Sequence, residues 1–96
     1  MGNAAKKLYS KQEYLYYHLN RKEYDKIDLI LAQNPELLEK PITKDTKHTL
    51  LMRAAFIASP ELVNFILEKN PNVNATAPNG DTALSIAVRR NNFEIV

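Results

Sequence analysis

Histidine and serine are the residues of this chain that could act as metal ligands or nucleophiles. The two histidines, His18 and His48, lie far apart, and neither has carboxylates around it at the spacing of a zinc site. We interpret His18 as a packed or partly solvated structural histidine rather than a metal ligand. The serines Ser10, Ser59 and Ser85 stand outside any Gly-x-Ser-x-Gly context, and each has a capping or packing role. The sequence therefore predicts neither a metal site nor a serine nucleophile.

The residues needed for phosphate binding and for acid–base catalysis are also missing. Only Gly2 and Gly80 are glycine, which is too few for a loop that cradles phosphate. The acidic residues are scattered, and no pair of them suggests general acid–base work. We therefore expect a segment that is not an enzyme and that carries no catalytic residue, no metal and no cofactor.

The amino terminus resembles an N-myristoylation signal, in which the acyl group joins a glycine exposed by methionine removal. Gly2 is followed by small residues and then by basic ones, although Lys6 stands where the usual motif has Ser or Thr. One myristoyl chain binds membranes only marginally, and Lys6, Lys7 and Lys11 would add electrostatic attraction to the membrane surface. Lipidation at Gly2 is a hypothesis, and the alternative is an unstructured tail over residues 1–9.

Composition limits the class of protein. The chain has 96 residues, of which 45% are hydrophobic and 25% are charged, as is ordinary for one soluble globular domain. Its formal charge of +2 is too balanced for a protein that binds polyanions, so we expect no nucleic-acid partner. Cysteine is absent, and no apolar run approaches the ~20 residues that cross a membrane. We predict a cytoplasmic protein, associated with membranes if Gly2 is acylated.

The clearest pattern along the chain is an internal repeat. Residues 49–55 (TLLMRAA) recur 33 residues later as residues 82–88 (TALSIAV). A weaker upstream copy matches residues 30–35 (ILAQNP) with residues 66–71 (ILEKNP). A fixed period of this size is typical of a stack of units, each of which buries its apolar face against a neighbour.

The pattern Asn74-Ala75-x-x-x-x-Gly80-x-Thr82-x-Leu84-x-x-Ala87 resembles the ankyrin repeat, and the resemblance covers roughly residues 10–96. It implies an all-α ankyrin-repeat solenoid, in which each unit is a β-turn finger followed by two antiparallel helices.

The chain departs from the ankyrin pattern at several positions. The Pro of the family's Thr-Pro-Leu-His is Leu50 in one copy and Ala83 in the next, and its His is Met52 and then Ser85. Lys47 replaces the turn glycine of the middle repeat. The apolar spacing is kept, so the predicted fold stands.

Capping residues in the sequence predict where the helices begin. Ser10 with Glu13 forms a capping box, Thr49 and Thr82 are further caps, and Ser59 caps a helix that starts with proline. The expected helices span residues 11–21, 23–33, 50–58, 61–69 and 83–91, and Asn92 would cap the next one. The dipeptide Asn79-Gly80 predicts a two-residue turn at a finger tip.

The expected organisation is a flexible tail over residues 1–9, an atypical amino-terminal capping repeat over 10–43, an ankyrin repeat over 44–76 and an incomplete repeat over 77–96. In the first unit, Leu37, Leu38 and Ile42 are expected to cover the end of the core rather than form a loose loop.

The last unit should leave an apolar face partly exposed, with Leu84, Ala87, Val88 and Ile95 on it. We expect further repeats or another chain to cover this end, since three repeats are about the minimum for stability. The favoured interpretation is a fragment of a longer array.

By the resemblance, the function is protein binding through the concave surface of finger tips and first helices, as a scaffold or adaptor with an unidentified protein partner. The family's contact positions correspond here to Asp45, Thr46, His48, Phe56, Ile57, Pro78, Asn79, Asp81, Arg89 and Arg90.

Two pairs among these positions have alternatives. Phe56 and Ile57 would be apolar anchors, or would simply pack on the neighbouring first helix. Arg89 and Arg90 would contact an acidic partner, or would form a solvated face. Two further functions stay open: a regulatory or targeting segment of a longer enzyme such as a kinase or acyltransferase, and a structural subunit of a large assembly.

Overall fold

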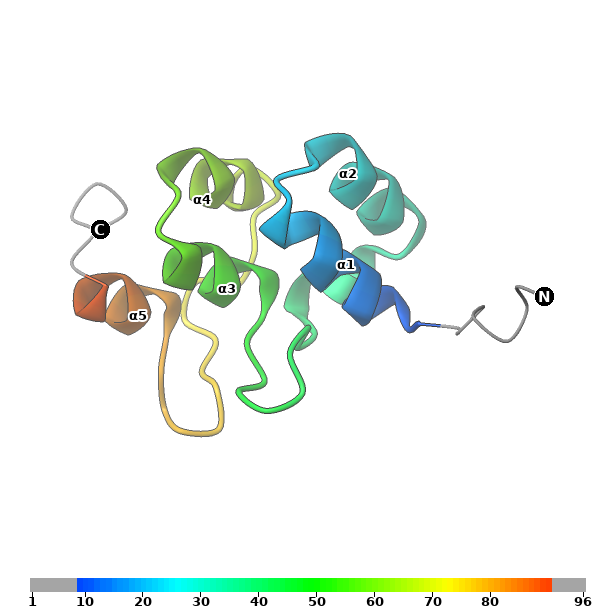
Figure 1. Cartoon of the computed structure of the whole chain (residues 1–96). Helices are drawn as coiled ribbons and strands as arrows, with labels where there is room; N and C mark the ends of the chain where they lie inside the picture. Colours follow the sequence, from blue (N-terminus) through cyan, green and yellow to red (C-terminus); the bar gives the residue numbers. More distant parts are fainter. Residues whose placement is uncertain (1–8, 91–96) are drawn as a thin grey trace.

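The computed structural model describes residues 9–90, and this part of the chain consists of helices and loops without any strand. The helices are α1 (Lys11–Asn20), α2 (Tyr24–Gln33), the 3-10 helix η2 (Pro35–Glu39), α3 (Leu50–Ile57), α4 (Pro60–Leu67) and α5 (Ala83–Arg89). In Figure 1, α1, α3 and α5 lie side by side in one layer, and α2 and α4 lie above them in a second. Gly2, Lys6, Lys7, Asn92 and Ile95 lie outside the described residues.

Side-chain caps start four of the helices, as predicted. The hydroxyl oxygens of Ser10, Thr49, Ser59 and Thr82 each accept a hydrogen bond from a backbone N–H in the first turn. Ser10 and Glu13 complete the expected capping box. Such caps satisfy N–H groups that have no partner within the helix, and a cap is typically worth about 1 kcal/mol.

The predicted helix bounds were correct to within two residues. The helix α2 ends at Gln33 as predicted, and the other four α-helices end one or two residues earlier than expected. The last turn of α3 stops at Ile57 because Ala58 takes left-handed angles (φ 64°). The helix α4 begins at Pro60 and ends at Leu67, and Asn70 (φ 58°) then reverses the chain. Left-handed residues commonly end helices, and Asn is among the few non-glycine residues that adopt them readily.

One apolar core joins α1, α2, α3 and α4. It includes Leu15, Leu19, Ile27, Leu50, Leu62 and Ile66, all fully buried. Leu37 and Ile42 belong to the same core with 4% exposure each, and Leu38 packs against it. The prediction that this stretch covers the core rather than forming a loose loop is therefore confirmed.

A second, smaller core lies between α3 and α5. Met52, Ala55, Ala77, Ile86 and Ala87 form it, and each is at most 5% exposed. The expectation that Ala87 faces outward was wrong, because this small side chain lets α5 pack closely on α3.

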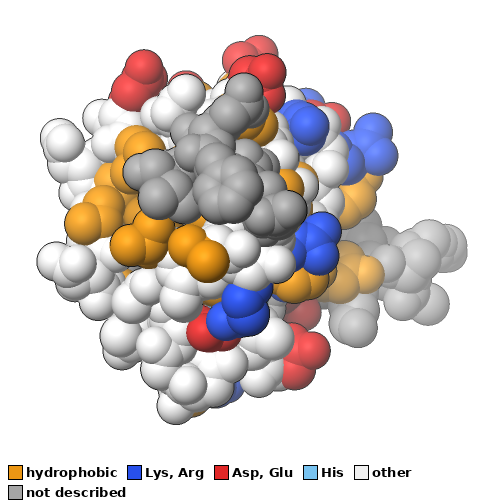
Figure 2. Space-filling model, turned by 90° about the vertical axis from the view of Figure 1, so that its left-hand side faces the viewer, with side chains coloured by type: hydrophobic (Ala, Val, Ile, Leu, Met, Phe, Trp, Pro, Cys, Tyr) orange, Lys and Arg blue, Asp and Glu red, His pale blue; other side chains and the backbone are white. Residues whose placement is uncertain are grey.

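The outer side of α4 and α5 carries exposed apolar side chains, as expected for Leu84 and Val88, which are 55% and 51% exposed. Leu67 is 36% exposed and lines the same hollow as Leu84. Figure 2 looks at this end of the stack and shows hydrophobic side chains gathered on it.

Two fingers project beyond the layer of α1, α3 and α5 (Figure 1). In the first finger (residues 42–48), Ile42 donates its N–H to the carbonyl of His48 at 2.7 Å. In the second finger (residues 77–81), Ala77 donates to the carbonyl of Asp81 at 2.8 Å. The first finger encloses five residues between its paired ends and the second encloses three.

The turn of the second finger differs from the predicted one. Gly80 donates its N–H to the carbonyl of Ala77 at 2.8 Å, so Pro78 and Asn79 are the central residues and Gly80 follows them. The reason is that Pro78 sets the backbone angle of the first central position, while Gly80 supplies the left-handed residue after the turn (φ 91°). Lys47, which replaces this glycine in the middle repeat, also takes positive φ (57°).

Candidate functional site

The two finger tips and the exposed sides of α1, α3 and α5 form one surface, which we call the finger–helix surface (Figure 1). The predicted contact residues Asp45, Thr46, Pro78 and Asn79 are exposed at the finger tips. Nothing in the described part of the chain covers them, so the structure brings these four residues to the position that the sequence predicted.

Side-chain hydrogen bonds shape the first finger. The Asp45 carboxylate accepts a hydrogen bond from the backbone N–H of Thr46 at 2.9 Å. The Thr43 and Thr46 hydroxyls are hydrogen-bonded to each other, and Thr43 also accepts the N–H of His48 at 2.9 Å. This local network holds the tip in one shape although its side chains are exposed.

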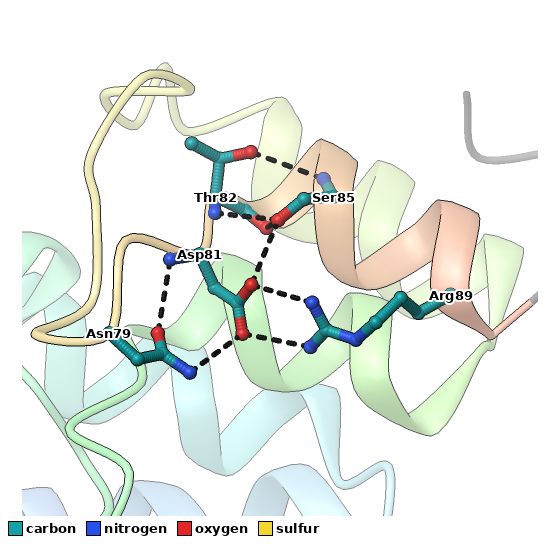
Figure 3. A network of polar contacts seen from close by, with 5 residues as sticks. All are labelled: Asn79, Asp81, Thr82, Ser85 and Arg89. Atoms are coloured by element: carbon teal, nitrogen blue, oxygen red, sulfur yellow. Dashed lines mark hydrogen bonds and ion pairs between the residues drawn. The ribbon is translucent and has the colours of Figure 1, made fainter.

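The second finger is tied to α5 by a larger network (Figure 3). The Asp81 carboxylate accepts two hydrogen bonds from the Arg89 guanidinium, at 2.6 and 2.8 Å, and one from the Asn79 amide at 3.0 Å. The backbone N–H of Asp81 donates to the Asn79 side-chain oxygen at 3.0 Å, and the Ser85 hydroxyl donates to the carboxylate at 3.3 Å.

This network changes the electrostatics of the predicted site. Hydrogen bonds from Arg89, which act most strongly, together with those from Asn79 and Ser85 lower the pKa of Asp81 to about 2, against the opposing effect of desolvation. The pKa of Arg89 is raised by the same pair. Asp81 and Arg89, predicted as separate contacts, thus neutralise each other, and Arg89 is not a free positive charge.

His48 is buried rather than exposed on the first finger. Its exposed fraction is 4%, and its ring lies 6.4 Å from that of Phe56, centroid to centroid. Burial lowers the pKa of His48, and the positive charges of Arg53 and Arg89 lower it further, against the opposing effect of Asp81 and Asp45. The finger folds back onto α3, so this predicted contact residue supports the surface from beneath.

The two predicted apolar anchors have different surroundings. Phe56 is 37% exposed, and the Arg53 guanidinium lies 4.3 Å from its ring centroid. Ile57 is partly buried and packs against the main core, which is the packing alternative. Of the pair, Phe56 is the one on the finger–helix surface.

A line of stacked cations and rings crosses this surface from α1 through α3 to the end of α5. The Arg53 guanidinium lies 5.4 Å from the Tyr16 ring centroid and 4.3 Å from that of Phe56, and the Arg90 guanidinium lies 4.7 Å from Phe56. We call Tyr16, Arg53, Phe56 and Arg90 the arginine–aromatic strip. Distances below about 6 Å place these cations within range of the ring quadrupoles.

The sequence reasoning missed Tyr16 and Arg53 as members of the site. A signal for Arg53 was available, because it precedes Phe56 by three positions on a helix and such residues are neighbours. A second signal is that its counterpart 33 residues later, Ile86, is apolar, so a charged residue at this position departs from the repeat. No comparable pattern points to Tyr16.

Beside the strip, α1 presents several tyrosines. A hollow lined by Tyr9, Glu13, Tyr14, Tyr16 and Tyr17 borders it, and Tyr14 and Tyr17 are 42% and 54% exposed. Tyr16 lines both the hollow and the strip. The aromatic part of the finger–helix surface therefore extends along α1.

Residues that could hold a metal are not gathered anywhere in the described chain. Within residues 9–90, no three His, Asp or Glu side chains approach one another closely enough to bind an ion. His18 is hydrogen-bonded through Nδ1 to the Glu23 carboxylate at 2.9 Å, which agrees with a structural role. None of the helices described has the length and apolar character needed to cross a membrane.

Comparison with known proteins gives one match. A family model described as ankyrin repeats, in three copies, matches residues 8–96. A comparison with curated proteins finds no match. The matched range covers the six helices and two fingers found within residues 9–90, and the paired layers in Figure 1 have the arrangement that such repeats form. The chain belongs to the ankyrin-repeat family.

Proposed function

We propose that this chain is a protein-interaction module, a scaffold or adaptor, that binds a protein partner through the finger–helix surface. Ankyrin repeats generally serve as protein-interaction modules, and stacked repeats offer extended surfaces for this purpose. Domains of this kind are typically not catalytic.

The observation that carries the proposal is the arginine–aromatic strip between the two fingers. Phe56 is a large ring left 37% exposed, and Arg53 and Arg90 stack on it. Aromatic and arginine residues dominate the binding energy of protein interfaces, especially near the centre of the interface. The exposed finger tips, with Thr46 and Asn79, would form the rim around this centre.

Photo-crosslinking in cells tests the proposal. A photoreactive amino acid replaces Thr46 or Asn79 at the finger tips, and in control variants it replaces Leu29 on α2 or Asn64 on α4, which are exposed on the second layer. We expect both finger positions to crosslink the same protein and both control positions to miss it. Crosslinking of that protein from Leu29 and Asn64 but not from the fingers would reject this surface.

A further inference from the structure

Phe56 brings two positive charges together without an acid between them. The guanidiniums of Arg53 and Arg90 lie 4.3 and 4.7 Å from its ring centroid. Within residues 9–90, neither arginine forms an ion pair with a carboxylate. In the described part of the chain, no ion pair with a carboxylate therefore offsets their mutual repulsion.

The other described arginines differ in this respect. Arg21 stacks on Tyr17 at 5.3 Å but also pairs with the Glu23 carboxylate at 3.3 Å, and Arg89 pairs with Asp81. An arginine that stacks on a ring can still donate hydrogen bonds from the edge of its planar group. The Arg21 guanidinium donates its edge hydrogen bonds to Glu23 within the molecule, whereas the guanidiniums of Arg53 and Arg90 can donate theirs to a partner.

Arg53 also has a hydrogen-bond donor that no group in the described structure satisfies. Its Nε is buried and has no hydrogen-bond partner in the described structure. A buried polar group without a partner destabilises the folded chain, because it has lost its hydrogen bonds to water. The equivalent position of the next repeat holds the fully buried Ile86, so an apolar residue fits this place in the stack.

His48, beneath the same ring, adds another unsatisfied atom. It is 4% exposed, and its Nδ1 is buried without a hydrogen-bond partner. The charged groups that act on it are Arg53, Arg89, Asp81 and Asp45. Because Arg89 is paired with Asp81, Arg53 and Asp45 are the two groups in this set that have no ion-pair partner within residues 9–90.

From this arrangement we infer that the arginine–aromatic strip binds an acidic segment of the protein partner, in which Asp or Glu alternates with apolar residues. The carboxylates accept hydrogen bonds from Arg53 and Arg90, and an apolar neighbour packs on the exposed part of Phe56. Pairing of guanidinium with carboxylate is favoured by its two-bond geometry. The inference rests on the proposed function, since it names the chemistry of the partner at the same surface.

The experiment uses fluorescein-labelled peptides of alternating Glu and Leu, with Gln–Leu and Lys–Leu peptides of the same length as controls, titrated by fluorescence anisotropy. We expect the Glu–Leu peptide to bind at least ~10-fold more tightly than the Gln–Leu peptide, as charged hydrogen bonds imply. Arg53→Gln and Arg90→Gln should each remove most of this preference. Arg21→Gln, the stacked arginine that has its own acid, should leave the preference unchanged.

A side-chain NMR signal separates direct contact from an indirect effect. The Nε–H resonance of Arg53 should shift on addition of the Glu–Leu peptide, because a carboxylate bound to the same guanidinium changes the electronic environment of this buried group. Equal affinity for the Glu–Leu and Gln–Leu peptides, or an unmoved Arg53 resonance, would overturn the inference. The crosslinking from Thr46 and Asn79 would stand in that case, since it does not depend on the partner's charge, so the two failures can be told apart.

Discussion

Arg89 and Asp81 join the last turn of α5 to the base of the second finger through two hydrogen bonds of 2.6 and 2.8 Å. The pair lies at the side of the surface where the partner is proposed to bind. Asp81 also accepts hydrogen bonds from Asn79 at the finger tip and from Ser85 on α5 (Figure 3). The Asp81 carboxylate therefore holds the second finger in place against α5.

This pair predicts a change in stability at acidic pH. The pKa of Asp81 falls from its ordinary value of 3.8 to about 2 in the folded chain, so its contribution is present above about pH 4 and is lost as pH falls through about 2. In Asp81→Asn, that contribution to the pH dependence of stability should be absent. Urea denaturation between pH 4 and pH 2 measures the free energy of unfolding of both proteins. If the wild type exceeds the variant by the same free energy across this range, the low pKa of Asp81 in the folded chain is contradicted.

His48 predicts a second pH dependence, in a different range. Its pKa is lowered in the folded chain from the ordinary 6.5, mainly by burial, so the unfolded chain binds the proton more readily. Stability should then be full above about pH 6.5 and should decrease as pH falls below that value. His48→Gln, which cannot titrate, should flatten the melting temperature between pH 7 and pH 5. An equal slope in wild type and variant would show that His48 is not the group involved.

Core packing can be tested separately from the surface. Leu62 is fully buried, and Leu62→Ala should destabilise the chain by about 2–5 kcal/mol, through lost burial and the cavity left behind. Leu29→Ala is the matched control, because the same substitution there removes a side chain that is 61% exposed. Thermal and urea denaturation measure both. A similar loss in the two variants would mean that the core is not where the structure places it.

Gly2 and its neighbours lie outside the described residues, and its acylation remains a proposal. Coexpression with an N-myristoyltransferase should raise the mass of the chain by one myristoyl group, and Gly2→Ala should prevent the increase because the enzyme requires an amino-terminal glycine. Mass spectrometry of the intact chain distinguishes the outcomes. An unmodified wild-type chain under these conditions would exclude Gly2 as an acceptor, and with it a myristoyl contribution to membrane association.

The sequence predicted the helices well because their signals are local. The caps Thr49 and Thr82 recur at the repeat spacing, and both are observed. Lys47 follows the repeat as well, since it takes positive φ like its counterpart Gly80 although its residue type gives no hint of it. Position in the repeat was therefore a better guide to backbone angles than residue type.

The candidate site was harder to predict because its contacts join separate elements. The pairing of Asp81 with Arg89 depends on how the second finger folds back toward α5, and the burial of His48 depends on the first finger lying against α3. Neither contact joins residues that are three or four positions apart on one helix, so no helical spacing in the sequence indicates it. Arg53 and Phe56 do have that spacing, so only this part of the strip was within reach of sequence reasoning.

The most direct test of the account is the affinity of Phe56→Ala for the protein that crosslinks to Thr46 and Asn79. Because Phe56 is 37% exposed, its removal should cost less stability than a buried Phe→Ala change, which costs ~3–5 kcal/mol. Because Phe56 is proposed as the central aromatic anchor of the interface, its replacement by Ala should weaken binding at least ~10-fold. Calorimetric titration and a melting curve of the same sample measure both. Weaker binding by a folded variant is the predicted result, and unchanged affinity would contradict the finger–helix surface as the binding site.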